Sequence, residues 1–195
     1  MILSNIGIHD ALDKGWLKIT PEPGTRQPGE GPAKCPYQTS AVDLRLGSEI
    51  AYFKSGIAVN IDLRKGDFNS LFGANSETRI ITDEQPFMLR PGKLVLGKTL
   101  ERVELPLLDE PQITLAARVE GKSSYARCGL LVHFTAPTVH AGFAGTITLE
   151  LINLGPLDIA LYPNMPICQL IIEQVSSKPF RNDSQFQGQA KPGGK

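Results

Sequence analysis

The sequence is poor in cysteine and has no excess of charge of either sign. Its three cysteines, Cys35, Cys128 and Cys168, are widely spaced and form no C-x-x-C pair. Separate cysteines in odd number suit a reducing, cytoplasmic environment better than a disulfide framework. Lysine plus arginine total 20, as do aspartate plus glutamate. The net charge therefore gives no reason to expect a nucleic acid or a membrane surface as partner.

Long hydrophobic runs are also missing. No segment reaches the roughly 18 apolar residues of a membrane-spanning helix, and the opening MILSNIGIHD has neither a basic flank nor a long apolar stretch. We therefore expect no membrane span and no signal peptide. A chain of 195 residues can bury the core of one domain. We place this domain at 1–175 and expect a flexible polar tail at 176–195.

What is present is a series of short strand patterns, which predicts an all-β fold. One helix is expected near residues 5–14, with Ser4 as its N-cap and Gly15 just past its end. Prolines and glycines exclude regular structure from 21–40. Short alternating segments then recur between turn residues, as in a sandwich or barrel. The expected strands are 41–47, 57–63, 78–81, 87–89, 94–100, 113–119, 130–135, 146–152, 156–162 and 167–172, with an irregular surface segment at 67–75.

The stretch GKSSYARCG, residues 121–129, predicts a short helical turn that could hold an anion. Ser123 and Ser124 can cap the turn, 125–128 can form it, and Gly129 can end it in the left-handed conformation. The free amides of a helix start, together with Lys122, Arg127 and two hydroxyls, suit a phosphate group.

A carboxylate stands out on the strand that follows. Glu150 lies on the face opposite Leu149 and Leu151 in the pattern TITLELI. If this side chain faces inward, it is costly to bury unless it is paired or used in chemistry. Most strand glutamates are simply solvated or ion-paired, so the position alone assigns no role.

These motifs resemble those of the dCTP deaminase family in the dUTPase-like superfamily. GKSSYARCG is similar to the family's G[RK]SS-x-AR motif, and AGFAGTITLELIN is similar to the turn and strand that follow it. VDLRLG at 42–47 also resembles a family strand, in which Asp43 and Arg45 are expected to be structural pairing residues. Trimeric dUTPases share the serine turn but lack the glutamate at the position of Glu150, so Glu150 favours deamination.

The resemblance implies a dUTPase-like distorted β-barrel or jelly roll, assembled as a homotrimer with sites at subunit interfaces. The implied activity is hydrolysis of dCTP to dUTP and ammonia, which feeds thymidylate synthesis. One alternative is a bifunctional dCTP deaminase and dUTP diphosphatase, or a dUTPase. Another is a non-catalytic trimer that binds dCTP, dUTP or dTTP in a regulatory role.

The resemblance also implies roles for the residues around the base. Glu150 is the proton shuttle, Ser123 and the backbone carbonyl of Ala136 place the water, and Arg127 lies beside the glutamate. Burial would raise the pKa of Glu150 and a neighbouring cation would lower it. We expect a carboxylate poised near neutrality, with an ordinary Arg127–Glu150 salt bridge as the alternative.

Phosphate binding is expected at Lys122, Ser124 and the amides of the helix start. Gln169 either lies near the α-phosphate or bonds to neighbouring backbone, and both readings stay open. The tail segment SQFQGQ resembles the family's lid, which brings in Phe186 and Gln189. Magnesium is expected to arrive with the triphosphate, bound chiefly by phosphate oxygens and water.

His140 and the lack of a zinc motif bear on the choice of reaction. His140 stands where dUTPases carry the aspartate that activates their attacking water, which argues against dUTP hydrolysis. It could contact the sugar or lie on the turn surface. The zinc deaminase signature, H-x-E followed by P-C-x-x-C, is absent, because no histidine has a glutamate two positions later. We therefore expect no zinc.

Overall fold

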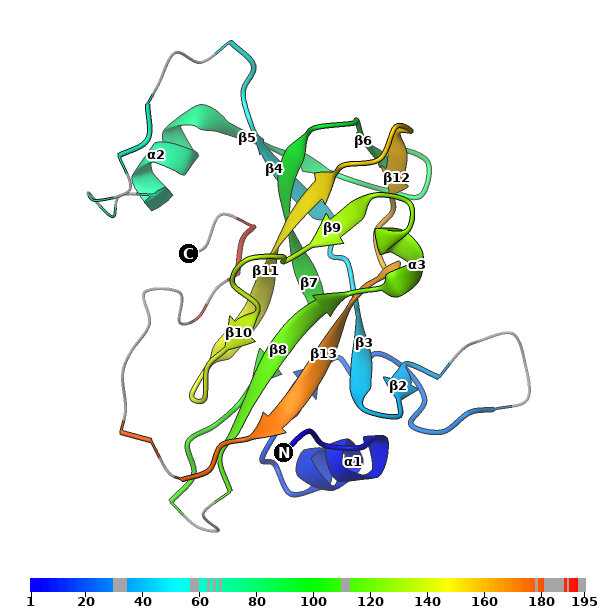
Figure 1. The fold of residues 1–195 in the computed structure, drawn as a ribbon, viewed down its shortest axis with the longest axis vertical. Helices are drawn as coiled ribbons and strands as arrows, with labels where there is room; N and C mark the ends of the chain where they lie inside the picture. Colours follow the sequence, from blue (N-terminus) through cyan, green and yellow to red (C-terminus); the bar gives the residue numbers. More distant parts are fainter. Residues whose placement is uncertain are drawn as a thin grey trace.

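The strands form two main sheets around one hydrophobic core (Figure 1). The computed structural model describes residues 1–29, 35–56, 60–62, 64, 66, 68–109, 113–177, 179–180, 188 and 190–192. Its elements are α1 (Asn5–Asp13), β1 (Lys18–Thr20), β2 (Tyr37–Gln38), β3 (Ala41–Arg45), β4 (Glu49–Phe53), α2 (Phe68–Asn75), β5 (Ser76–Ile80), β6 (Phe87–Leu89), β7 (Leu94–Glu104), β8 (Leu115–Gly121), α3 (Ser123–Ala126), β9 (Leu130–Val132), β10 (Thr138–Val139), β11 (Ala144–Asn153), β12 (Ile159–Leu161) and β13 (Pro166–Gln174).

The pairing of the strands confirms the all-β prediction. The larger sheet runs β5-β4-β7-β11-β9, with β1 also paired to β7, and the smaller sheet runs β10-β8-β13-β3-β2. A separate ribbon joins β6 and β12. Within the described residues, the one strand-type backbone pairing between the two main sheets is the isolated bridge Leu46–Thr99. The fold is therefore an open, distorted sandwich rather than a closed barrel.

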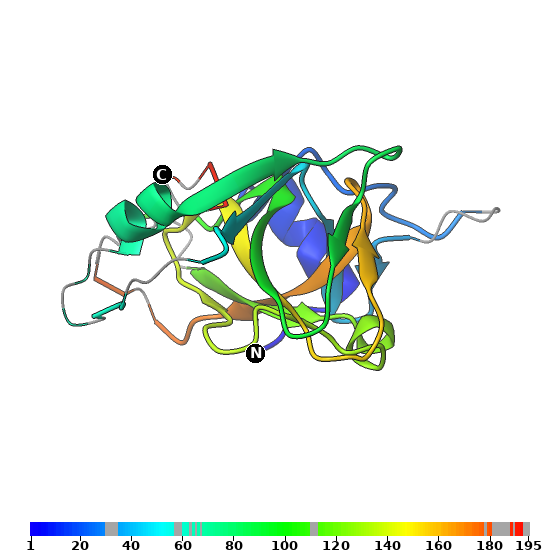
Figure 2. The same cartoon turned by 90° about the horizontal axis from the view of Figure 1, so that it is seen from above.

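Both main sheets, seen from above in Figure 2, direct alternate side chains into the same core. Leu149 and Leu151 of β11 and Leu170 and Ile172 of β13 are fully buried in one cluster. Burying a side chain of this size contributes about 1.5–3 kcal/mol. The alternation of apolar with polar residues therefore decides which face of each strand points inward.

Helix α1 forms as predicted and is the longest of the described helices. Ser4 Oγ accepts a hydrogen bond from Gly7 N at 3.2 Å, and Gly15 has φ 71°. Ile8 and Ala11 bury one face of the helix. The cap and the apolar face were both readable from local sequence.

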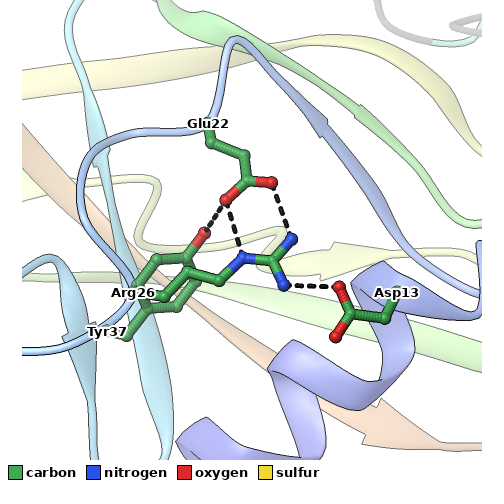
Figure 3. A network of polar contacts seen from close by, with 4 residues as sticks. All are labelled: Asp13, Glu22, Arg26 and Tyr37. Carbon is green, nitrogen blue, oxygen red and sulfur yellow. Dashed lines mark hydrogen bonds and ion pairs between the residues drawn. The ribbon is translucent and has the colours of Figure 1, made fainter.

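The proline-rich segment that follows is held by a polar network, drawn in Figure 3. Arg26 binds Glu22 through Nε at 3.0 Å and Nη2 at 2.7 Å, and its Nη1 contacts Asp13 of α1. The Tyr37 hydroxyl donates to Glu22 at 3.1 Å. The described part of the predicted irregular segment is therefore tied to α1 without helix or long strand.

Two predictions about the middle of the chain were wrong. Residues 68–75 form helix α2 rather than an irregular excursion. Phe72 packs edge-on against Phe53, with ring centroids 5.0 Å apart, and joins Ala51 and Leu96 in a small buried cluster. A helix of this length shows little periodicity, and tertiary packing is what stabilises it.

The strand predicted at 57–63 does not appear in its described central part. Residues 60–62 belong to no strand, and 57–59 and 63 lie outside the described residues. The other predicted strands form near their predicted positions, and β7 and β11 are longer than expected. Strands β1, β2, β4 and β10 were not predicted. No helix in the described residues is long and apolar enough to cross a membrane.

Candidate active site

The short helix α3 forms where the serine motif predicted it, but with different ends. It spans Ser123–Ala126, and Lys122 occupies the N-cap position without a capping side chain. The prediction that the serines cap the helix was wrong, because both lie inside its first turn. Gly129 has φ 92°, and a Cβ there would lie 2.2 Å from the nitrogen of Gly155. Only glycine fits this junction.

Glu150 lies on the outer face of the larger sheet rather than in the core. Leu149 and Leu151 are fully buried, whereas the Glu150 side chain is 37% exposed. The prediction that Glu150 lies on the face opposite Leu149 and Leu151 is therefore confirmed. Strand alternation places the acid on the opposite face from the leucines, where a ligand could reach it.

The partner of Glu150 within the chain is His133, which directly follows β9. The His133 backbone N–H donates to the Glu150 carbonyl at 2.9 Å, and Nδ1 lies 2.7 Å from Oε2. The two atoms are within ion-pair distance, although the ring N–H is not aligned as in an ideal hydrogen bond. His133 has φ 51°, which turns the chain and ends the strand predicted to continue to 135.

The pKa of the Glu150 carboxyl lies below its ordinary value. Burial acts to raise this pKa, but the neighbouring His133 and the backbone N–H of Glu150 outweigh burial. The expectation of a carboxylate poised near neutrality was therefore wrong for the single chain. The side chain is ionised at neutral pH, as a base that accepts a proton from water must be.

Several predicted partners of Glu150 are exposed and apart from it. Ser123, Ser124 and Arg127 form an exposed edge of α3. No ion pair or hydrogen bond joins Arg127 to Glu150 among the described residues, so the chain alone does not bring them together. Ala136 is exposed in the loop after β9.

His140 is exposed as well, in the turn before β11. Its carbonyl accepts the amide of Phe143 at 3.1 Å, and Gly142 N bonds to Leu105 O at 2.7 Å. The turn is therefore pinned by its backbone, and the imidazole is free to meet a ligand or solvent.

Lys122 and Gln169 do meet, through Asp43 of β3. Lys122 Nζ is 2.6 Å from Asp43 Oδ2, and Gln169 Nε2 donates to Oδ1 at 3.1 Å. Gln169 thus bonds to the side chain of Asp43. The alternative named from the sequence was a bond to neighbouring backbone. Asp43 and Arg45 are pairing residues as predicted, since Arg45 Nε contacts the fully buried Glu101 at 2.6 Å.

The described part of the tail lies against the larger sheet. Gly188 N donates to Ala144 O at 3.0 Å, and Lys98 Nζ donates to Ala190 O at 2.7 Å. Lys98 of β7 pairs with Thr148 of β11. Thr148 lies two residues before Glu150 on β11, so both are on the same face of the sheet. The predicted lid residues Phe186 and Gln189 lie outside the described residues.

Neither His133 nor Asp43 was predicted to act in the site. Alternation along LLVHF placed His133 on the polar face of its strand, but the contact with Glu150 depends on strand register, which local sequence does not show. Asp43 was identified only as a pairing residue. In the described part of the chain, no group of three or more His, Cys, Asp or Glu side chains could hold a metal ion.

Comparisons with known proteins point to one family. A model of dCTP deaminase-like proteins matches residues 2–175. The dUMP-forming dCTP deaminase of Dictyoglomus thermophilum is 42% identical over 177 residues, covering 91% of this chain and 82% of that protein. The dCTP deaminase of Thermomicrobium roseum is 37% identical over 197 residues, covering 98% of this chain and 91% of that protein.

A solved structure supports the fold. The crystal structure of 2'-deoxycytidine 5'-triphosphate deaminase from Agrobacterium tumefaciens superposes with a TM-score of 0.59 at 18% identity, covering 88% of this chain and 47% of that chain. The family match and the structural match each cover most of this chain. Because the family match spans every strand described above, this chain belongs to the dCTP deaminase family.

Proposed function

We propose that this protein is an enzyme that hydrolyses dCTP to dUTP and ammonia, with Glu150 as its acid–base and without a metal-bound water. The observation that carries the proposal is the ionised Glu150 carboxylate, half-exposed on the outer face of the larger sheet beside His133. Its position in the TLE strand after the GKSS turn supports the same assignment.

The reaction needs one group that moves protons between water and the pyrimidine. Glu150 takes a proton from a water that attacks C4 of cytosine, and then gives it to N3. A second proton passes from the new hydroxyl through Glu150 to the amino group, which leaves as ammonia. Oε2 faces His133 at 2.7 Å, which leaves Oε1 for the water. A carboxylate with a lowered pKa suits the first step.

The remaining groups of the site would come from another copy of the chain. Ser123 and Arg127 are exposed on α3 and have no contact with Glu150 of their own chain among the described residues. In a homotrimer, the α3 edge of one subunit would supply Ser123 and Arg127 to Glu150 of its neighbour. Arg127 would then stabilise the developing negative charge.

Phosphate binding is assigned to Lys122, Ser124 and Gln169. The C-terminal tail would fold over the bound phosphates as a lid. Lys122 and Gln169 converge on one carboxylate, so both present donors from the same place. Magnesium would be carried by the phosphate oxygens of the nucleotide, where it would offset their charge.

A second candidate is the bifunctional reaction, which releases dUMP and pyrophosphate. The name of the Dictyoglomus relative, a dUMP-forming dCTP deaminase at 42% identity, favours it. His140 still argues against it, since the turn offers a histidine where dUTPases have an aspartate.

One assay tests the proposal and separates the candidates. The protein is incubated with dCTP or dUTP, with and without magnesium, and ammonia, pyrophosphate, dUTP and dUMP are measured. Ammonia and dUTP are expected from dCTP. Pyrophosphate and dUMP in place of dUTP would establish the second candidate. Glu150→Gln keeps the shape but cannot shuttle protons, so ammonia release should fall by about a thousandfold or more. Ammonia release retained in Glu150→Gln would overturn the role of Glu150.

A further inference from the structure

One mostly buried carboxylate joins the two side chains assigned to phosphate. The Asp43 side chain is only 12% exposed, and the Lys122 side chain is 19% exposed. Oδ2 contacts Lys122 Nζ at 2.6 Å and Oδ1 accepts from Gln169 Nε2 at 3.1 Å. We propose that Asp43 is a positioning residue, which holds Lys122 and Gln169 as a preformed cradle for the phosphates of the nucleotide. The inference rests on the proposed function of the site.

The geometry leaves donors available for a ligand. An ammonium has three N–H groups and a primary amide has two, and Asp43 takes one from each. Gln169 lies directly opposite Asp43 in the β13–β3 register, and Lys122 directly follows β8, which pairs with β13 on its other side. Three neighbouring strands therefore bring the carboxylate and both donors to one point of the smaller sheet.

Residues of the segment before β3 hold Asp43 in place. Its backbone N–H donates to Pro36 O at 2.8 Å, and Gln38 Nε2 approaches Oδ2 at 3.4 Å. The next residue along from Pro36, Tyr37, bonds to the Glu22–Arg26 network of Figure 3. The carboxylate therefore stands within β3, and the segment that precedes this strand is anchored as well.

Helix α3 begins at Ser123, directly after Lys122, so the serine helix lies beside this carboxylate. Burial raises the pKa of the Tyr125 hydroxyl, and the negative charge of Asp43 raises it further. The α3 edge and the cradle therefore belong to one surface region, as a triphosphate that bridges them requires.

Two effects of Asp43 on phosphate oppose each other. Its negative charge repels a phosphate. Its contacts fix a flexible lysine before the ligand arrives, so the rotamer entropy of Lys122 is lost on folding and not on binding. If Asp43 mainly competes for Lys122, removing its charge tightens phosphate binding. If Asp43 mainly positions the donors, removing its charge weakens binding.

The test is Asp43→Asn in the full chain, which keeps the shape and removes the charge. Binding of dCTP and of inorganic triphosphate is measured by calorimetry, and kcat and KM for deamination are measured in parallel. We expect the dissociation constants and KM to rise about tenfold, the loss of roughly one hydrogen bond to a charged group. We expect kcat to change less than about twofold, since Glu150 lies on the other sheet. Unchanged or tighter binding of inorganic triphosphate would overturn the positioning role.

A double-mutant cycle separates positioning from a purely structural effect. If Asp43 acts partly through Lys122, Asp43→Asn should weaken binding less in a Lys122→Gln background than in the wild type. Fully additive losses would contradict this coupling. Glu173→Gln is the matched control, because it removes the carboxylate of the Arg118–Glu173 ion pair on the same strand, β13, as Gln169. Triphosphate binding by Glu173→Gln should equal that of the wild type.

A second double-mutant cycle leaves Asp43 in place, so it tests the cradle even if Asp43→Asn does not fold. Lys122→Gln and Gln169→Leu should each weaken triphosphate binding, with a combined loss smaller than the sum. Additive losses would count against a shared cradle.

If the wild type releases no ammonia from dCTP, the proposed function fails, whereas binding of inorganic triphosphate still tests the cradle. If the wild type deaminates dCTP and Asp43→Asn binds triphosphate normally, only the positioning role fails.

Discussion

At the scale of residues, the contact between His133 and Glu150 sets the protonation state of the proposed acid–base. Burial alone would hold more of the carboxyl in its neutral form. His133 reverses this effect and keeps the pKa of Glu150 below its ordinary value. The direction of the shift follows from a neighbour that lies 17 positions away in the sequence and 2.7 Å away in space.

His133→Asn should move the acid limb of the pH profile to higher pH. In the wild type, the ionised base is present above a pKa that lies below the ordinary value of about 4.3. Asparagine tolerates the positive φ of this position but carries no charge. Burial of Glu150 then acts without the neighbouring histidine, so its pKa rises. The measurement is kcat/KM for ammonia release between about pH 4 and pH 8.

The control for this prediction is His9→Asn, a histidine that packs against Tyr37 near α1. Its acid limb should coincide with that of the wild type. An acid limb that stays in place in His133→Asn would show that His133 does not govern the ionisation of Glu150.

At the scale of elements, the local sequence pattern was sufficient to predict the junction between α3 and β9. Gly129 follows α3 in the left-handed region, and a Cβ added there would collide with the backbone of Gly155. The glycine was predicted to end the helical turn, for this conformational reason. Its close approach to Gly155 came from the packing of two distant loops, and that approach holds the α3 edge in place.

Gly129→Ala should destabilise the protein more than an ordinary glycine substitution. The new Cβ would lie 2.2 Å from Gly155 N, and alanine is strained at φ 92°. A cost of about 3 kcal/mol lowers the melting temperature of a chain of this size by about 6–12 °C. Circular dichroism melting measures this shift.

Gly73→Ala on α2 is the matched control, because nothing lies within 4 Å of its Cβ position. It should leave the melting temperature equal to or slightly above that of the wild type, since alanine favours helix. Equal melting temperatures for Gly129→Ala and the wild type would mean that the junction can open at little cost.

At the scale of the whole molecule, two parts of the proposed site make no hydrogen bond or ion pair with each other in the described residues of one chain. Arg127 is exposed on α3, whereas Glu150 faces out from the larger sheet beside His133. The predicted homotrimer would join them across an interface, so each site would use residues from two copies.

Mixing two inactive variants tests this arrangement. Glu150→Gln and Arg127→Gln should each lose ammonia release alone. After subunit exchange in equal amounts, about a quarter of the sites should carry both native residues, by random assortment between neighbouring subunits. Activity near that fraction of the wild type is expected, with the mass of the assembly measured by light scattering. No recovery despite proven exchange, or full activity in a monomer, would exclude a shared site.

The sequence by itself determined the all-β class, the first helix, the serine turn and the strand that carries Glu150. These features depend on alternation, caps and glycine conformations, which act over a few neighbouring residues. The family motif also lay within one continuous stretch, residues 121–153, so no knowledge of the fold was needed to see it.

Only the tertiary structure decided what each polar side chain meets. Helix α2 depends on Phe72 packing against β4 and β7, and the state of Glu150 depends on the register between β9 and β11. Lys122 and Gln169 meet on Asp43, although 79 and 126 positions separate them from it. Burial and pKa follow from such long-range neighbours, because charge acts through distance in space rather than along the chain.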